Sequence, residues 1–521
     1  MPGSFTYPGV YVEELPGAHT IAGVATSIAA FIGWAAQGPT GQASLVQSWA
    51  EFQARFGGFN ANDGVYLGYA VNQFFANGGQ QTYIVRLVWD GALTPAPGTT
   101  PAASATASAA GVGGSLTLFA ASPGLWGDSI AVAVTTTPAN PGRFGLQVWF
   151  GGTVVESFAD LSIAATDAKY VVSVIDSDSN YISFIDPATN AAVVPTAEPT
   201  ATAAPAPLAN GLNGAILVPA SDGNFELVLA SNAASGVNLL DGVTFNLLCV
   251  PGETDAATIQ VLQDYCARRR AFYIVDPPRT ASFASLNASG PVGTTWAAAP
   301  PPASRRRRTP PIPPIIFLGC WRPIRCPATR RNFGRPAASW RASTPPPTAR
   351  GAYGRPPPAV AAALSGEVGL QYALTDIENG DLYSQGINCL RHFAAYGDVI
   401  WGARTLLGAD QAGSQWKYVP VRRLALFLES SLYAGLKWVV FEPNGEALWG
   451  QIRTSVGAFM QQLFVEGAFQ GATPGEAYFV KCDLDNNPQS STELGIINIE
   501  IGFAPLYPAE FEVIQIQQMV G

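Results

Sequence analysis

Two stretches, one near each end of the chain, have the residue pattern of β-strands. The first covers residues 7–14 (Tyr-Pro-Gly-Val-Tyr-Val-Glu-Glu), and the second covers residues 511–520. A strand needs hydrogen-bonding partners, and a long apolar edge is an aggregation hazard unless another chain completes it. Strand character alone favours the simpler alternative, in which both stretches join the sheet of their own domain. The pattern therefore leaves open whether these strands pair within the chain or link it to neighbouring chains.

Length and composition indicate a large protein of low charge. A chain of 521 residues predicts roughly three to four domains. Hydrophobic residues make up 48% and charged residues only 12%, which favours a subunit of an assembly over a free monomer. The net charge of −9 disfavours general nucleic-acid binding. There is no apolar run of about 18 residues and no basic leader before an apolar stretch, so neither a membrane span nor a signal peptide is expected.

The cysteines predict no metal site. Six are scattered along the chain and none forms a Cys-x-x-Cys pair. This spacing indicates reduced, mostly buried thiols in a cytoplasmic protein.

The first part of the chain predicts an α/β core that is interrupted by a β-rich insertion. After an N-terminal arm (1–24), residues 25–92 contain a buried strand at 28–33, a helix capped by Ser48 and Glu51, a helix at 64–77 and a strand at 81–88. Residues 93–235 follow as an inserted variable domain. It opens with a linker-like stretch at 93–112, and short strands are expected at 115–120, 129–135, 144–150, 170–175 and 225–229.

The rest of the chain returns to α/β patterning. Residues 236–385 form a middle domain with a strand at 245–250, a helix at 255–270 and a strand at 271–275, which predicts a parallel βαβ unit. Residues 386–510 form a C-terminal domain with a helix at 421–436, a strand at 437–441 and a long helix capped by Asn444. Strands are expected at 477–481 and 495–501, and residues 511–521 form the C-terminal arm.

One segment, 297–359, differs in composition from the rest. It contains arginine and proline in excess and no Asp, Glu or Lys. A basic nucleic-acid patch around Arg305–308 and a disordered linker are two explanations. We favour a third, translation in the wrong frame, because a two-base shift over 337–359 allows an ordinary peptide ending in Gly-Val-Trp-Lys-Ala-Ala-Ala-Gly. The gene's DNA sequence tests this hypothesis.

Motifs for enzymatic chemistry are scarce. None of the four lysines follows a glycine, so a P-loop is excluded. The two histidines, His19 and His392, are too few for a His-based metal cluster or a Ser-His-Asp triad and are expected to be structural. The carboxylates Asp376, Glu378 and Asp381 are expected in a polar loop. Residues 483–487 are expected to form an Asx-rich turn, since they lack the Gly and Glu of a calcium loop.

Several motifs lie near the two ends of the chain. The N-terminal part contains Pro-Gly-Val-Tyr-Val-Glu-Glu (8–14), Gly-Val-Ala-Thr-Ser (23–27) and Phe-Gly-Gly-Phe (56–59). The denser C-terminal motifs include Trp-Gly-Ala-Arg-Thr (401–405), Phe-Glu-Pro-Asn (441–444) and Pro-Ala-Glu-Phe (508–511). Together they resemble the motifs of contractile phage tail sheath proteins, including the sheaths of related contractile injection systems and tailocins. Ser-Pro-Gly-Leu-Trp-Gly (122–127) looks like the family's entry into its variable domain.

The resemblance implies a fold and a function. The fold is a multidomain α+β and α/β protein, in which N- and C-terminal parts form an α/β core around the inserted β-rich domain. The terminal strands would be arms exchanged between subunits, with Val10, Tyr11, Val12 and Glu13 at one end and Val513, Ile514 and Ile516 at the other. The function is a non-enzymatic subunit of a helical sheath that contracts around a tail tube without a cofactor, in a virion, a prophage-derived particle or an injection device.

The implied partners are further copies of the chain, the tail tube protein, and baseplate and tail-terminator proteins, with assembly in the bacterial cytoplasm. Arg422, Arg423, Lys437 and Arg453 are candidates for contact with the tube. Two alternatives remain from the residues themselves: an enzyme of α/β hydrolase-like or nucleotide-dependent type, which the missing motifs disfavour, and a nucleic-acid binder acting through residues 297–359.

Overall fold

The computed structural model describes two compact units. The described residues are 19–89, 105–106, 109–136, 142–186, 191–221, 223–231, 236–278, 280–289, 315–318, 364–366, 370 and 372–511. The C-terminal unit comprises residues 19–24 and 423–511, and the core unit comprises the described residues from 25 to 422. Both predicted arm strands, 7–14 and 511–520, lie outside the described residues except for Phe511.

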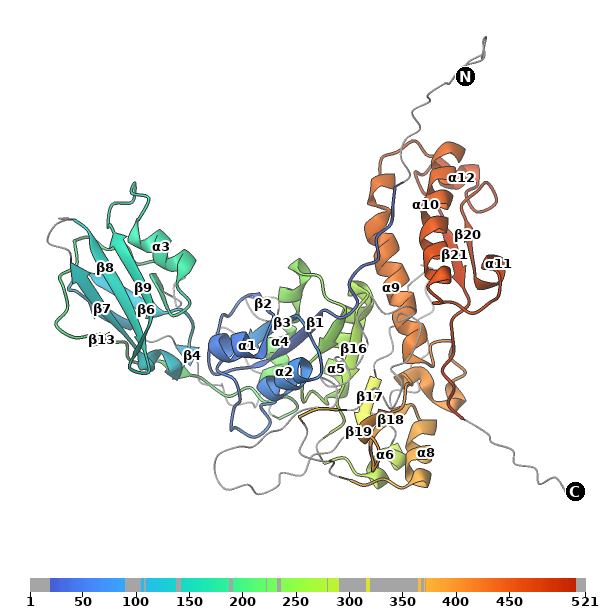
Figure 1. The fold of residues 1–521 in the computed structure, drawn as a ribbon, viewed down its shortest axis with the longest axis horizontal. Coiled ribbons are helices and arrows are strands. Elements are labelled where there is room, and N and C mark those ends of the chain that lie inside the picture. The colour runs from blue at the N-terminus through green and yellow to red at the C-terminus, as the bar shows by residue number, and fades with distance from the viewer. Residues whose placement is uncertain are drawn as a thin grey trace, which may run out of the picture. The chain divides into compact units, whose positions relative to one another are not determined.

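An eight-stranded sheet organises the core unit (Figure 1). Its order is β19-β18-β17-β16-β15-β1-β3-β2. The strands are β1 (Ala29–Trp34), β2 (Ala43–Val46), β3 (Thr82–Leu87), β15 (Leu247–Cys249), β16 (Phe272–Val275), β17 (Ile315–Leu318), β18 (Ile387–Phe393) and β19 (Gly397–Trp401). Six central strands run parallel, and only the edge strands β2 and β19 are antiparallel to their neighbours. The short, continuously apolar runs in the sequence suit strands that are buried on both faces.

Among the described residues, six helices accompany this sheet, and α1, α2 and α5 lie where the sequence predicts helices. They are α1 (Trp49–Phe56), α2 (Leu67–Ala76), α4 (Asn224–Ala230), α5 (Ala256–Arg269), α6 (Phe283–Ser289) and α8 (Asp376–Ser384). The Ser48 side chain caps α1 by accepting from Glu51 N at 3.1 Å, but the Glu51 carboxylate accepts from Gln47 N instead of returning to Ser48. The predicted βαβ unit is confirmed, because β15 and β16, which precede and follow α5 in the sequence, pair in parallel.

A second hydrophobic core belongs to the inserted region. A four-stranded sheet, β13-β7-β8-β9, and a three-stranded sheet, β10-β6-β5, enclose it. Their strands are β5 (Ala109–Val112), β6 (Leu116–Ala120), β7 (Ile130–Thr136), β8 (Phe144–Phe150), β9 (Thr153–Leu161), β10 (Ile182–Ser183) and β13 (Ala206–Pro207). Two short pairs complete the region, β4 (Ala105–Thr106) with β14 (Leu212–Asn213) and β11 (Ile185–Asp186) with β12 (Ala191–Ala192). The end of the linker expected at 93–112 is therefore not a linker, since it contains β4 and β5.

Three expected elements of the core unit are wrong. Residues 170–175 form the helix α3 (Val171–Asp178), and residues 225–229 lie in the helix α4 instead of a strand. In α4 the buried side chains are Phe225, Val228 and Leu229, at a spacing of three and four that suits a helix. The carboxylates expected in a polar loop lie on α8, which Thr375 and Glu378 cap reciprocally.

Two further features bear on the expected domains. Strands β18 and β19, which lie in the C-terminal domain expected at 386–510, pair within the core sheet. Within the unusual segment 297–359 the structure describes only β17, and the rest lies outside the described residues. Because β17 pairs in parallel with both β16 and β18, these four residues of the segment belong to the central sheet.

The C-terminal unit is built on two long helices, α9 (Val419–Gly435) and α10 (Glu446–Val465). The apolar face predicted for α10 is confirmed, since Leu448, Ile452, Val456, Phe459 and Leu463 are all buried. The remaining elements are the turns of helix α11 (Pro474–Ala477) and α12 (Gln489–Thr492), and the strands β20 (Tyr478–Lys481) and β21 (Glu500–Phe503).

Three local expectations in this unit are corrected. The strand expected at 495–501 begins only at Glu500, where β21 starts. Residues 437–441 do not form a strand: Lys437–Val439 is a single 3-10 turn, and Val440 and Phe441 are exposed. The cap of α10 is Gly445, while the side-chain oxygen Oδ1 of Asn444 accepts from Trp449 Nε1 at 3.0 Å.

Candidate assembly surface

A two-stranded antiparallel sheet in the C-terminal unit has the geometry of an acceptor for further strands. β20 pairs with β21 in a register that sets Phe479 opposite Gly502 and Val480 opposite Ile501. Within the part of the chain that the structure describes, neither strand has a second partner. A two-stranded sheet is marginally stable by itself, so the two outer edges are open positions for pairing.

The hydrogen-bond alternation identifies the groups along those edges. Ala504 N donates to Ala477 O at 2.8 Å, which places this pair and the Phe479–Gly502 pair in the bonded positions. The backbone N–H and C=O groups of Val480 and Ile501 therefore point outward, one on each edge. Each edge has the donors and acceptors that an added strand requires.

A network of asparagine side chains holds the connection between the two strands. Asn487 is fully buried, and its side chain donates to Asp483 O at 3.1 Å and to Asn498 O at 3.0 Å. It also accepts from Asn498 N at 2.5 Å. Asn486 Nδ2 donates to Lys481 O at 2.9 Å. The Asx-rich turn predicted for 483–487 is thus confirmed, and it fixes the spacing of β20 and β21.

Residues 19–24 pack within the C-terminal unit although they are distant from it in sequence. Ile21 is buried in the core of α9 and α10, and a Cβ added to Gly435 would lie 2.7 Å from its side chain. His19 stacks on Trp438 with ring centroids 4.0 Å apart. Residues 19 and 511, where the two predicted arms adjoin the described chain, therefore both belong to the unit that carries the β20–β21 sheet.

The four tube-contact candidates differ in their surroundings. Arg422 is fully buried, with its guanidinium 4.6 Å from the centroid of the Trp416 ring, so it offers no surface to a partner. Arg423 is partly buried, and desolvation of its guanidinium lowers its pKa to about 10. Lys437 lies at the 3-10 turn, 5.7 Å from the Tyr433 ring centroid. Arg453 bonds Glu446 at 2.6 Å and also donates to Cys482 O, which ties α10 to the chain after β20.

Exposed apolar side chains also lie on this unit, in the run 437–441 for which the sequence predicts a strand. Phe441 is fully exposed and has a φ of +74°, a conformation that costs energy for a bulky residue. Val440 and Tyr433 are exposed nearby in the sequence. The sequence of residues 437–441 did not predict the exposure of Val440 and Phe441, because an apolar run normally predicts burial.

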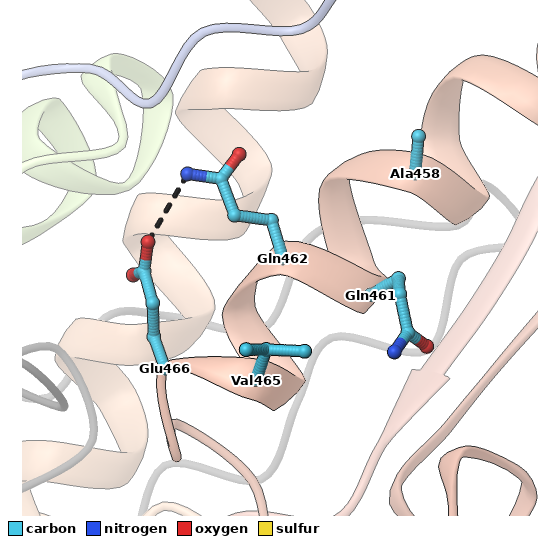
Figure 2. Close-up of a pocket in the computed structure, with 5 residues that line it drawn as sticks. All are labelled: Ala458, Gln461, Gln462, Val465 and Glu466. Carbon is cyan, nitrogen blue, oxygen red and sulfur yellow. Dashed lines mark hydrogen bonds between the residues drawn. The ribbon is translucent and has the colours of Figure 1, made fainter.

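A hollow of about 660 Å³ lies along the outer face of α10. Figure 2 shows the side chains of Ala458, Gln461, Gln462, Val465 and Glu466 that line it. Gln462 donates to Glu466 at 3.1 Å, and Gln461 accepts from the Tyr478 hydroxyl at 2.8 Å, which links the helix to β20. No group of three or more His, Cys, Asp or Glu among the described residues is arranged to hold a metal ion.

Comparison with protein families and solved structures identifies the relatives of this chain. Residues 411–518 match the family model described as the phage tail sheath C-terminal domain. No curated protein matches the chain.

Among solved structures, the sheath of the extracellular contractile injection system PVC in its contracted state matches with a TM-score of 0.54 at 18% identity, covering 99% of both chains. The sheath tail protein of Listeria innocua matches with a TM-score of 0.56 at 12% identity, covering 94% of this chain and 96% of the other. The contracted helical sheath of the anti-feeding prophage matches with a TM-score of 0.53 at 18% identity, covering 99% of both. These matches confirm the resemblance inferred from the motifs, and the solved structures show a sheath-protein fold.

Proposed function

We propose that this chain, which carries the C-terminal domain of the phage tail sheath family, is a structural subunit of a contractile sheath. The matched family is a structural one. Subunits would polymerise around a tail tube by exchanging β-strands and would contract to drive the tube through a target envelope. The observation that carries this proposal is the β20–β21 sheet with an open position on each edge.

The number of open edges equals the number of predicted arms. One arm contains Val10, Tyr11, Val12 and Glu13, and the other contains Val513, Ile514 and Ile516. An arm from each of two neighbouring subunits would add one strand to each edge and complete a four-stranded sheet. Each added strand contributes modestly, but two linkages per subunit, repeated through a lattice, give high avidity.

This arrangement also suits contraction. Both arms adjoin the unit that carries the acceptor sheet, so the linkages connect C-terminal units to one another. Such linkages can act as hinges while subunits move, and the free energy would come from a metastable extended lattice. The remaining partners in this proposal are the tube, the baseplate and the tail terminator, with assembly in the bacterial cytoplasm before the particle matures. No helix in the described part of the chain has the length and apolar character needed to cross a membrane.

The surface that contacts the tube is proposed to include Lys437, Arg453 and the exposed part of Arg423. Lys437 and Arg453 reach solvent, and each also contacts its own chain. We leave Arg422 out of this surface because it is buried.

Blocking one edge of the sheet tests the strand-exchange proposal. The substitution Val480→Pro removes the outward N–H of β20 and leaves the bonded positions of β20 with β21 intact. The matched control is Val480→Ala, which removes side-chain contacts but retains the N–H. We expect tubes or rings from wild type and Val480→Ala in negative-stain electron microscopy, and neither tubes nor rings from Val480→Pro.

The corresponding change on the other edge is Ile501→Pro, with Ile501→Ala as its control. Circular dichroism and thermal unfolding check that each variant folds. If the folded proline variants assemble as well as their alanine controls, the two edges do not accept strands and the proposal is wrong.

A further inference from the structure

The outer edge of β21 continues beyond the strand itself. β21 has four residues, Glu500–Phe503, but the alternation of side chains starts earlier. The odd-numbered side chains from 497 to 503 all pack against the hydrophobic core of the C-terminal unit, whereas Ile496 and Glu500 are exposed. A period of two is that of a β-strand. Residues 496–503 therefore form an eight-residue segment with strand alternation, which we call the extended edge.

Asparagine side chains hold the first half of the extended edge, where β20 does not reach. Asn498 N donates to Asn487 Oδ1 at 2.5 Å, and Asn498 O accepts from Nδ2 of Asn486 and of Asn487, both at 3.0 Å. Asn486 Nδ2 also donates to the carbonyl oxygen of Lys481, the last residue of β20. The two amides therefore lie on the same side of the segment as β20 and pair with its backbone as a strand would.

The opposite side of the extended edge faces outward. Backbone direction alternates along a strand, and Asn498 and Gly502 both bond on the β20 side. The N–H and C=O groups of residues 497, 499, 501 and 503 therefore point the other way. Among the described residues, none of these groups has a hydrogen-bond partner. β21 alone would offer only residues 501 and 503, whereas the extended edge suits an added strand of about eight residues.

The C-terminal arm has side chains that suit the two faces of this edge. Ile514 and Ile516 share one face of a strand, and Gln515 and Gln517 share the other. With the isoleucines towards the core, the glutamine amides lie on the same face as Glu500 and can donate to its carboxylate. One apolar face and one neutral polar face therefore match the extended edge.

The N-terminal arm suits the shorter edge of β20 instead. Tyr11 and Glu13 share one face of a strand, and beside Glu500 that face would bring two carboxylates together. On β20 the corresponding face presents Phe479 and Lys481, since Lys481 lies directly opposite Glu500. An aromatic and a basic side chain suit Tyr11 and Glu13 as cross-strand neighbours, and the exposed ion pair that Lys481 forms with the following turn is weak.

The chain's own C-terminal arm starts away from the extended edge. After β21 the described chain runs away from the β20–β21 sheet (Figure 1). Phe511, the first residue of the predicted arm, is exposed. A second copy of the chain is therefore the source of a strand for this edge.

On the basis of the strand exchange proposed above, we propose that the C-terminal arm of a second copy pairs along the whole extended edge, and that the N-terminal arm of another copy pairs with β20. Asn486 and Asn487 are positioning residues for this contact, because they keep the first half of the edge in line with β21.

The substitution Ile499→Pro tests the length of the edge. It removes an outward N–H that precedes β21, and proline favours the extended conformation that Asn498 needs. The matched control is Ile499→Ala, which loses side-chain contacts but keeps the N–H. Sedimentation over a concentration series should show assembly of Ile499→Ala, and of Ile499→Pro only at about tenfold higher concentration, because one hydrogen bond to the arm is lost.

The outcomes separate this proposal from strand exchange itself. Circular dichroism and thermal unfolding establish that the variants are folded. If Ile499→Pro assembles at the same concentration as Ile499→Ala while Ile501→Pro does not assemble, the edge ends at β21, and the extended edge is wrong although strand exchange stands. If Ile501→Pro also assembles like its alanine control, the proposed function fails at this edge.

Peptide binding tests which arm each edge accepts, and its first measurement uses the wild-type chain. The probe is a fluorescein-labelled peptide of residues 511–521, and fluorescence anisotropy follows its binding to the full chain. A peptide of residues 6–15 is the second probe, and a scrambled 511–521 peptide is the control. Ile499→Pro should weaken binding of the 511–521 peptide about tenfold relative to Ile499→Ala and leave the 6–15 peptide unaffected. Val480→Pro should have the opposite selectivity.

Two results of this measurement would overturn the assignment of the arms. One is that wild type binds the 511–521 peptide no more tightly than the scrambled control. The other is that Ile499→Pro weakens binding of the 6–15 peptide as much as, or more than, binding of the 511–521 peptide.

Discussion

The backbone N–H of Val24 donates a hydrogen bond to the Ser431 hydroxyl at 3.1 Å, although the two residues are 407 positions apart in sequence. Ser431 is fully buried on α9. Val24 is the last residue of the segment 19–24, so this bond fixes the end of that segment to α9 of the C-terminal unit. A contact between residues distant in sequence therefore holds the segment that follows the predicted arm strand 7–14.

We expect Ser431→Ala to destabilise the C-terminal unit by about 1–3 kcal/mol, because Val24 N would lose its partner while remaining partly buried. Hydrogen exchange measured by mass spectrometry should show faster exchange over residues 19–24. The control, Ser490→Ala, changes an exposed serine. It should leave the free energy of unfolding within about 0.5 kcal/mol of wild type and the exchange over residues 19–24 unchanged. Equal exchange in the two variants would contradict this role for Ser431.

Arg86 connects the core sheet to the entry of the inserted region. From β3 its buried guanidinium donates to Ala35 O at 2.8 Å, Gly38 O at 2.6 Å and Pro123 O at 2.8 Å. Burial lowers the pKa of this group to about 9, and the three carbonyl oxygens offset the cost of burying its charge.

We expect Arg86→Lys to reduce the free energy of unfolding by about 2–4 kcal/mol, since one ammonium cannot reproduce the planar set of bonds and leaves carbonyl groups unpaired. Urea unfolding measures the change. Arg143→Lys is the matched control, because Arg143 forms a partly exposed ion pair with Asp167 at 2.7 Å and should cost at most about 1 kcal/mol. A similar loss of unfolding free energy in both variants would show that the buried hydrogen bonds of Arg86 stabilise the protein no more than the exposed ion pair of Arg143.

Phe441 combines full exposure with a left-handed backbone, so it costs stability without contributing burial. Asparagine adopts this conformation more readily, and we expect Phe441→Asn to stabilise the isolated subunit by about 0.5–1 kcal/mol. Val440→Asn, at an exposed neighbour with an extended backbone, should give no such gain. Thermal unfolding of the two variants distinguishes them. If Phe441→Asn also weakens assembly, the exposed ring is a contact between subunits or with the tube.

Local patterns predicted the elements in which a regular period coincided with burial. The apolar face of α10, the strands β1 and β3 and the βαβ unit around α5 follow from residue spacing and capping. The errors occurred where short apolar runs carried no clear period. Residues 170–175 are rich in β-branched residues but form α3, because Val171, Val172 and Ile175 pack together into the core of the inserted region.

By itself the sequence determined the α/β character, the sheath-family motifs and the absence of common catalytic motifs, because these depend on residues that are close together along the chain. The tertiary structure decided which distant groups meet: Val24 with Ser431, and Arg86 with three carbonyl oxygens. It also decided that β20 and β21 form a sheet with two open edges. These features depend on long-range packing and on the depth of each polar group, which no local pattern in the sequence specifies.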